Sequence, residues 1–190
     1  MPLADATCLT LHPHPATPRS ALCAADVLLQ PARDGLQLTY RLFGEVLRLQ
    51  IPDPRPAARV DGLWRHSCCE AFISVPGTPA YREFNFSPSG EWAVYDFADY
   101  RQASPAPQAD IAPEIHCRLA PDVLEVSVHL PAAWLPAGGE KEEFELGLSL
   151  VVETLGSSSE PQLSYWALRH AADHPDFHCR AGFMARFAHP

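Results

Sequence analysis

The chain has 190 residues and a formal net charge of −9 at pH 7, with only 14 Lys and Arg residues. This acidic balance argues against a surface for nucleic acid or for anionic membranes, because both need clustered basic side chains. A chain of this length is most simply one domain, residues 1–190. Its 20 prolines, about twice the usual ~5% share, favour strands and turns over helices.

The sequence carries no basic segment followed by an apolar one at its N-terminus, and no run reaches the ~18 apolar residues of a membrane span. We therefore expect a cytoplasmic protein that does not enter a membrane. The six cysteines include no Cys-x-x-Cys pair. Without an export signal, they are predicted to be reduced, buried thiols rather than disulfides.

Alternation of apolar and polar residues predicts strands from the beginning of the chain. The first two are expected over Thr7–His12 and Ser20–Gln30, and the clearest one covers Gly35–Phe43. The apolar run Gly44–Gln50 is interpreted as a further strand. Three prolines then predict a loop over Ile51–Asp61.

Three short strands, separated by Gly, Pro and Ser clusters, are predicted within residues 63–101. Successive side chains of a strand point to opposite faces, so Cys69 and Ile73 belong to an apolar face while Glu70 points the other way. If the first strand extends back to Trp64, its polar face adjoins the polar face of the next strand. The residues expected on this common face are Trp64, His66, Glu70, Glu83 and Asn85.

The rest of the chain continues the same pattern. The expected elements are a loop at Ala103–Ala109, paired strands at Ile111–Leu119 and Val123–Leu130, a helical turn at Pro131–Leu135, a strand at Phe144–Glu153, a polar turn at Gly156–Pro161, a strand at Leu163–Leu168 and a tail rich in His and Asp. About ten short strands without helical periodicity predict an all-β fold, either a two-sheet antiparallel β-sandwich or a barrel.

Several motifs resemble one family. They are Trp64 followed by Glu70-x-Phe72-Ile73, then Tyr81-x-x-Phe84, Glu83-Phe84-Asn85, the hairpin Ser87-Pro88-x-Gly90, Tyr100-Arg101, Trp166 and Pro175-Asp176-Phe177-His178. Together they resemble the DOMON-like β-sandwiches of carbohydrate-binding-module family 9, and more narrowly small bacterial proteins that consist of this domain alone. The resemblance implies a jelly-roll-like sandwich with a sugar site between two aromatic walls. By motif position these walls would be Trp64 and Trp166, with Glu70 as a polar partner.

A saccharide site needs flat rings and fixed polar groups, because a pyranose presents an apolar face of C–H groups and an equator of hydroxyls. We therefore predict non-catalytic binding of a small hydroxylated ligand, most simply a saccharide. Stacking is assigned to Trp64 and Trp166. The residues assigned to hydrogen bonding are Glu70, Glu83 and Asn85, with His66 and His178 nearby. No cofactor is expected, although the family analogy would admit calcium.

Other interpretations stay open at this point. Glu70 and Glu83 could form the acid and base of a hydrolase, or a polar network that fixes the fold. The tail segment His170–His178 contains ligand types suited to a metal. Haem binding, known among DOMON relatives, would need an axial ligand, and the only methionine after the first residue is Met184. The aromatic face could also dock a protein partner, which the sequence does not identify.

Overall fold

The chain folds into strands and short 3₁₀ helices in a computed structural model that describes residues 6–17, 21–105, 111–137, 143–155 and 161–188. The strands are β1 (Thr7–Pro13), β2 (Leu22–Ala32), β3 (Gly35–Gly44), β4 (Cys68–Ser74), β5 (Tyr81–Phe86), β6 (Trp92–Asp99), β7 (Gln102–Ala103), β8 (Glu114–Leu119), β9 (Val123–Pro131), β10 (Glu143–Leu155), β11 (Pro161–Ala167) and β12 (Ala185–Ala188). Parts of the loop predicted at Ala103–Ala109 and of the turn predicted at Gly156–Pro161 lie outside the described residues. None of the described helices is long or apolar enough to span a membrane.

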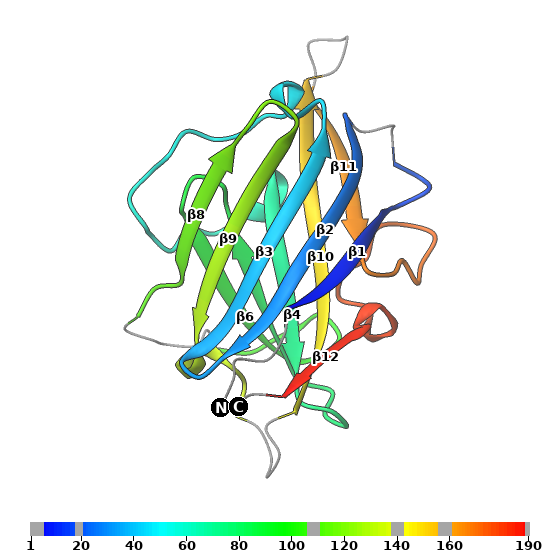
Figure 1. Ribbon diagram of the computed structural model, residues 1–190. Coiled ribbons are helices and arrows are strands. Elements are labelled where there is room, and N and C mark those ends of the chain that lie inside the picture. The colour runs from blue at the N-terminus through cyan, green and yellow to red at the C-terminus, as the bar shows by residue number, and fades with distance from the viewer. Residues whose placement is uncertain (1–5, 18–20, 106–110, 138–142, 156–160, 189–190) are drawn as a thin grey trace.

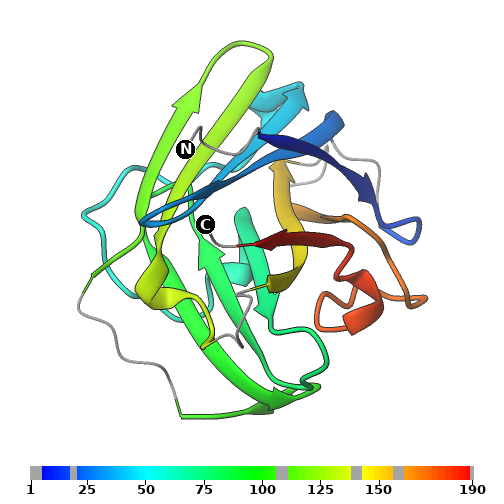
Figure 2. The same ribbon diagram turned by 60° about the horizontal axis from the view of Figure 1, so that its bottom comes forward.

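Two antiparallel sheets pack face to face, which confirms the predicted β-sandwich (Figure 1). The strand order is β1-β2-β3-β9-β8 in the first sheet and β7-β6-β5-β4-β10-β11 in the second. β1 joins the two sheets, because its last residues, His12 and Pro13, pair with β11 while its earlier residues pair with β2. β12 pairs with the first part of β10, and β11 pairs with the later part. Figure 2 brings β12, drawn in red, to the front.

The core lies between the two sheets and follows the predicted alternation. Every second residue of β3 and β4 packs there, including Leu38, Tyr40, Ala71 and Ile73. The Tyr40 hydroxyl also donates a hydrogen bond of 2.7 Å to the backbone oxygen of Glu70. Each fully buried aliphatic side chain contributes about 1.5–3 kcal/mol. These inward faces therefore fix the register of β4, and with it the residues that face outward.

The segment Gly44–Gln50, predicted as a strand, instead contains the 3₁₀ helix Val46–Arg48. Its two buried side chains, Val46 and Leu49, are three positions apart, and the residues between them are exposed. Spacing of i and i+3 is that of a 3₁₀ helix, whereas a half-buried strand would bury every second residue. The strand prediction for this segment is therefore wrong.

The strand that was expected to extend back to Trp64 begins only at Cys68. Residues Leu63–Arg65 form a 3₁₀ helix, which follows Gly62 in the left-handed conformation at φ 81°. Glycine adopts this conformation without steric cost. Trp64 therefore approaches the outer face of the second sheet from a turn and not from the strand itself.

All six cysteines lie in the described part of the chain and are free thiols, but Cys8, Cys23 and Cys117 are exposed, so the prediction of buried thiols is wrong for these three. Cys68 and Cys69 are both buried on β4, and burial raises the pKa of each thiol well above its usual value. Such thiols stay protonated and are poor nucleophiles at neutral pH.

The C-terminal tail packs on the outer face of the second sheet through Phe183. Its ring centroid lies 5.9 Å from those of Phe72 and Tyr81. The ring also covers Gly147 of β10, where a Cβ atom would lie only 2.8 Å from the Cδ1 atom of Phe183. The tail can therefore pack on the sheet only because residue 147 is a glycine.

We expect Gly147→Val to push Phe183 off the sheet and to lower the free energy of unfolding by about 2–3 kcal/mol. Urea denaturation of the purified protein measures this loss. In a Phe183→Ala background the same substitution should cost less than about 1 kcal/mol, because the clashing ring is gone. If Gly147→Val lowers the free energy of unfolding equally in both backgrounds, its effect does not come from the clash with the Phe183 ring.

Candidate functional site

A pocket of about 530 Å³ opens on the outer face of the second sheet, the face turned away from the core. Its volume is within the range of small-molecule sites. The lining residues are Trp64, Glu70, Phe72, Glu83, Tyr95, Phe97, Arg101, Val151, Tyr165, Pro175, Phe177 and His178. The sheet supplies the floor of this pocket, and the tail and the 3₁₀ helix around Trp64 supply further lining.

The strand register brings the floor residues side by side, because directly paired residues of antiparallel strands share a face. Phe72 of β4 pairs with Glu83 of β5, which pairs in turn with Tyr95 of β6. Glu70, two residues before Phe72, pairs on its other side with Ser149 of β10. Glu70 and Glu83 are therefore diagonal neighbours on the floor.

Aromatic rings line the pocket from three separate parts of the chain. Tyr165 of β11 pairs with Val151 of β10, and the Phe177 ring from the tail packs against Tyr165 at a centroid distance of 6.1 Å. Trp64 is 47% exposed, and the Arg65 guanidinium lies 5.1 Å from its ring centroid. These rings come together only through the fold, since they are far apart in the sequence.

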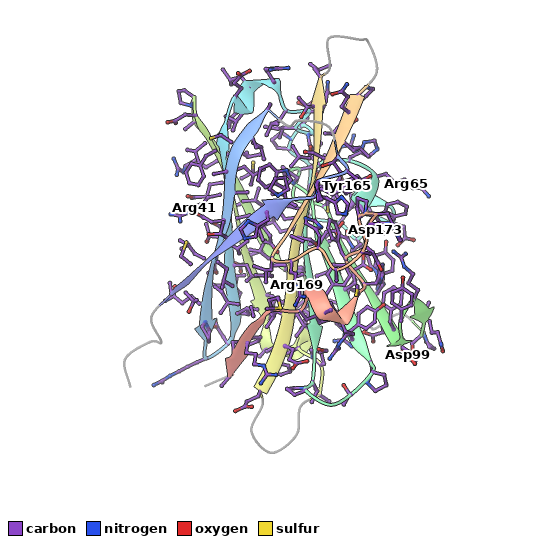
Figure 3. All side chains as sticks on the ribbon, turned by 90° about the vertical axis from the view of Figure 1, so that its right-hand side faces the viewer. Arg41, Arg65, Asp99, Tyr165, Arg169 and Asp173 are labelled. Atoms are coloured by element: carbon purple, nitrogen blue, oxygen red, sulfur yellow. The ribbon has the colours of Figure 1, made fainter. Side chains whose placement is uncertain are left out.

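Figure 3 shows the two outer faces of the sandwich from the side. Arg65, Asp99 and Asp173 lie on the side of the second sheet, and Arg41 lies on the opposite side. Arg41 belongs to the first sheet, where it pairs with Asp26 at 2.7 Å. The pocket therefore occupies one outer face, and the first sheet presents the other.

Asp176 fixes the tail over the sheet. Its carboxylate accepts hydrogen bonds from the Tyr100 hydroxyl at 2.9 Å, the Arg101 guanidinium at 2.9 Å and the backbone N–H of His178 at 3.2 Å. Burial raises the pKa of Asp176, but hydrogen bonds from Tyr100 and Arg101 outweigh this effect, so the net pKa is lowered. The tail is thus held by a carboxylate that stays ionised.

Arg101, in the hairpin between β6 and β7, is the one described residue other than glycine with a positive φ, 53°. For such a residue the left-handed conformation costs about 1–3 kcal/mol. It lets the Arg101 backbone N–H donate to the Tyr81 hydroxyl at 3.1 Å, while the guanidinium binds Asp176 and lines the pocket. The strained backbone conformation of Arg101 therefore places a guanidinium at the border of the cavity.

A series of polar contacts runs from this hairpin to the floor. The Tyr81 hydroxyl lies 2.8 Å from Nδ1 of His178, and Nε2 of His178 lies 3.7 Å from Oε2 of Glu83. Burial and then the positive charge of Arg101 lower the pKa of His178 to about 4, so the imidazole is neutral at pH 7. A neutral ring that accepts from Tyr81 at Nδ1 turns its N–H toward Glu83.

Glu70 and Glu83 are buried acids, with only 3% and 6% of their surfaces exposed. Ser149 donates to Glu70 at 3.3 Å and Asn85 donates to Glu83 at 2.7 Å, but no described Lys or Arg forms an ion pair with either carboxylate. Burial raises the pKa of both carboxyls, and the charge of Glu83 raises that of Glu70 further. The floor therefore holds an unneutralised charge or a proton shared by two carboxylates.

The raised pKa of Glu70 predicts how stability depends on pH. A carboxyl whose folded pKa exceeds its unfolded value of about 4.3 stabilises the fold below that value and loses this contribution as the pH rises through the folded pKa. Glu70→Gln removes the buried charge, so the variant should exceed the parent in stability at about pH 8 by about 1–3 kcal/mol. Urea denaturation near pH 4 should show no difference in stability between the variant and the parent. If Glu70→Gln is less stable than the parent at about pH 8, Glu70 does not have a raised pKa in the folded protein.

Of the residues predicted for the site, Trp64, Glu70, Glu83 and His178 line this pocket. Asn85 lies on the same face of β5 as Glu83 and pairs with Glu70, but it is fully buried and does not line the pocket. It donates to Glu83, and its side-chain oxygen lies near the Cys68 thiol, so it orients a floor carboxylate. Contact of these residues with a ligand stays a prediction.

Trp166 and His66, also predicted for the site, lie elsewhere. Trp166 is only 3% exposed and packs in the core, because on β11 it has the opposite orientation to Tyr165. His66 is exposed, and its Nδ1 atom lies 2.9 Å from the Glu153 carboxylate. The prediction that Trp166 forms the second aromatic wall is therefore wrong, and Tyr165 and Phe177 line the pocket instead.

The tail residues considered as metal ligands are held apart by separate partners. His170 contacts the backbone oxygen of His12 at 2.8 Å, whereas Asp176 binds Arg101 and His178 contacts Tyr81. Across the described ranges, no group of three or more His, Cys, Asp or Glu side chains lies close enough to hold a metal ion.

Comparison with solved structures identifies similar folds. A protein named as "a putative carbohydrate-binding protein" from Bacteroides uniformis has a TM-score of 0.59 at 16% sequence identity, over 95% of this chain and 86% of that chain. A family 9 carbohydrate-binding module from Caldicellulosiruptor kristjanssonii, solved in complex with cellotriose, has a TM-score of 0.48 at 11% identity, over 83% of this chain and 72% of that chain. No family model matches the chain, and no curated protein matches it in sequence. The likeness to the Bacteroides protein confirms, at the level of the fold, the resemblance drawn from the sequence motifs.

Proposed function

We propose that this protein binds a small saccharide in the pocket on the outer face of its second sheet. One observation carries the proposal: a single cavity combines aromatic walls with two buried carboxylates and a guanidinium. Mostly apolar walls with a few fixed polar groups are typical of small-ligand sites, and a saccharide offers both an apolar face and hydroxyls.

In this proposal Trp64 is the stacking platform, since nearly half of its surface is open to solvent beside the cavity. Tyr165 and Phe177 provide further apolar surface for the C–H groups of the sugar. Glu70 and Glu83 accept hydrogen bonds from its hydroxyls. Stacking and a few hydrogen bonds, offset by desolvation, support dissociation constants in the micromolar to millimolar range, about −8 to −4 kcal/mol.

A panel of monosaccharides and β-linked and α-linked oligosaccharides tests this proposal. Isothermal titration calorimetry gives the affinity, and tryptophan fluorescence reports whether Trp64 changes its surroundings on binding. At least one saccharide should bind and raise the melting temperature of the protein, because a ligand of the folded state stabilises it. If no saccharide binds at millimolar concentration, the proposal fails.

Glycosidic hydrolysis is the second candidate, because Glu70 and Glu83 lie on one floor and both have a raised pKa. Glycosidases use a pair of carboxyl groups, one protonated and one ionised, across the scissile bond. Mass spectrometry of each oligosaccharide after incubation separates the two candidates. An intact ligand indicates binding alone, and shortened products that disappear with Glu83→Gln indicate hydrolysis.

A further inference from the structure

The charges that border the pocket do not balance. Glu70 and Glu83 both face the cavity, and among the described residues the basic side chain in the lining is Arg101. Its guanidinium is already bound to Asp176 at 2.9 Å. Burial raises the pKa of Glu83 by more than the Arg101 charge lowers it, and among the described residues Arg101 forms its ion pair with Asp176 and not with a floor acid.

The imidazole of His178 does not supply the missing charge. It lies 3.7 Å from Glu83, but burial and Arg101 hold its pKa at about 4, so it is neutral near pH 7. The other contacts of the floor acids come from the neutral groups of Ser149 and Asn85. Buried carboxylates usually have a cationic partner, because desolvation of an unpaired charge is costly.

The aromatic rings around Glu70 and Glu83 are also suited to a cationic partner. In the sheet register Phe72 and Tyr95 flank Glu83 on its two sides, and both rings line the cavity together with Trp64. The face of an aromatic ring attracts a cation, and sites for ammonium groups combine such rings with acidic side chains. A neutral ligand would use the rings but would leave the charge on the floor uncompensated.

We propose that the saccharide taken by this pocket carries a protonated amino group, which lies against the Glu70 and Glu83 carboxylates. This inference rests on the proposed function and narrows the ligand to the class of amino sugars. The ammonium group supplies N–H donors to both carboxylates, while the sugar ring keeps its stacking surface for the aromatic walls. With one proton shared between the two carboxyls the floor carries a single negative charge, which the ammonium group neutralises.

The experiment compares ligands that differ in one group. Glucosamine, glucose and N-acetylglucosamine have a protonated amine, a hydroxyl and a neutral amide at the same ring position, and galactosamine and a chitosan oligomer extend the series. Calorimetric titration at about pH 6.5, where the amine is largely protonated, gives the affinities. Choline is included as an ammonium compound without a sugar ring.

We expect glucosamine to bind at least about tenfold more tightly than glucose or N-acetylglucosamine. Glu70→Gln and Glu83→Gln should each reduce this preference to less than about threefold, since an uncharged amide keeps the shape but loses the attraction. Glu125→Gln is the matched control, because Glu125 pairs with Arg118 on the first sheet, away from the pocket. It makes the same change in net charge and should keep the preference.

The outcomes separate this inference from the function on which it rests. Equal affinities for glucosamine and glucose would overturn the ammonium assignment and leave saccharide binding intact. Binding of choline without any sugar would support the ammonium site and overturn the saccharide proposal. No binding in the whole series would overturn both. The comparison of ligands needs only the parent protein, so it decides the question even if a variant fails to fold.

Discussion

Trp64→Ala should raise the dissociation constant of the bound saccharide by about 30-fold or more, equivalent to about 2 kcal/mol. The indole is 47% exposed at the pocket, so it offers a flat apolar surface that no neighbouring side chain replaces. Calorimetry on the best ligand of the panel measures this loss. The fold should be unaffected, because Trp64 lies on a short 3₁₀ helix and outside the core.

Leu47→Ala is a suitable control for this experiment. Leu47 is a large apolar side chain on another 3₁₀ helix, is 72% exposed and does not line the pocket. Its truncation should leave both affinity and melting temperature unchanged within about 1 °C. If the Trp64 and Leu47 variants bind equally well, the stacking role assigned to Trp64 is wrong.

Asp176→Ala should have the largest combined effect on stability and binding. The side chain is only 5% exposed and receives hydrogen bonds from Tyr100, Arg101 and the His178 backbone. Truncation removes the shared acceptor of these donors, and because the Tyr100 and Arg101 side chains are about half exposed, water replaces part of the loss, so we expect the free energy of unfolding to fall by about 1–2 kcal/mol. Because Phe177 and His178 then lose their fixed position, ligand affinity should drop by at least about tenfold.

Asp173→Ala provides the matched comparison, since Asp173 is an exposed acid three residues earlier in the same tail (Figure 3). Both variants remove one negative charge, so any difference between them comes from the hydrogen bonds that Asp176 accepts. Urea denaturation and calorimetry should show a near-wild-type Asp173 variant. If the two substitutions have the same small effect, the tail is not held by Asp176.

The floor of the site could be predicted from sequence because it depends on local alternation. Because side chains alternate along a strand, the apolar residues Cys69 and Ile73 predict that Glu70 points to the other face. The same alternation predicts that Glu83 and Asn85 share one face of the neighbouring strand. Burial of one face of a strand determines the orientation of every residue in it. The positions of both carboxylates followed from this rule.

The walls could not be predicted, because they depend on contacts between distant parts of the chain. On β11 the family resemblance points to Trp166 by motif position, but its neighbour Tyr165 has the outward orientation. Tyr95 and Phe97 could have been found by the alternation that places Val94 in the core. Arg101, in contrast, owes its place to a left-handed backbone conformation; the Tyr100-Arg101 motif marked the residue, but strand alternation does not give the direction of its side chain.

The tail that lines the pocket leaves β11 and returns as β12, and both strands pair with β10. Because both ends of this tail are held by pairing with the same strand, we expect the tail to stay over the sheet and not to open as a hinged lid. We therefore expect a ligand to enter and leave the pocket without a slow opening step. Stopped-flow traces of association should accordingly be single exponentials whose rate grows linearly with concentration, and the lifetime of the complex should reflect contact strength rather than a gate.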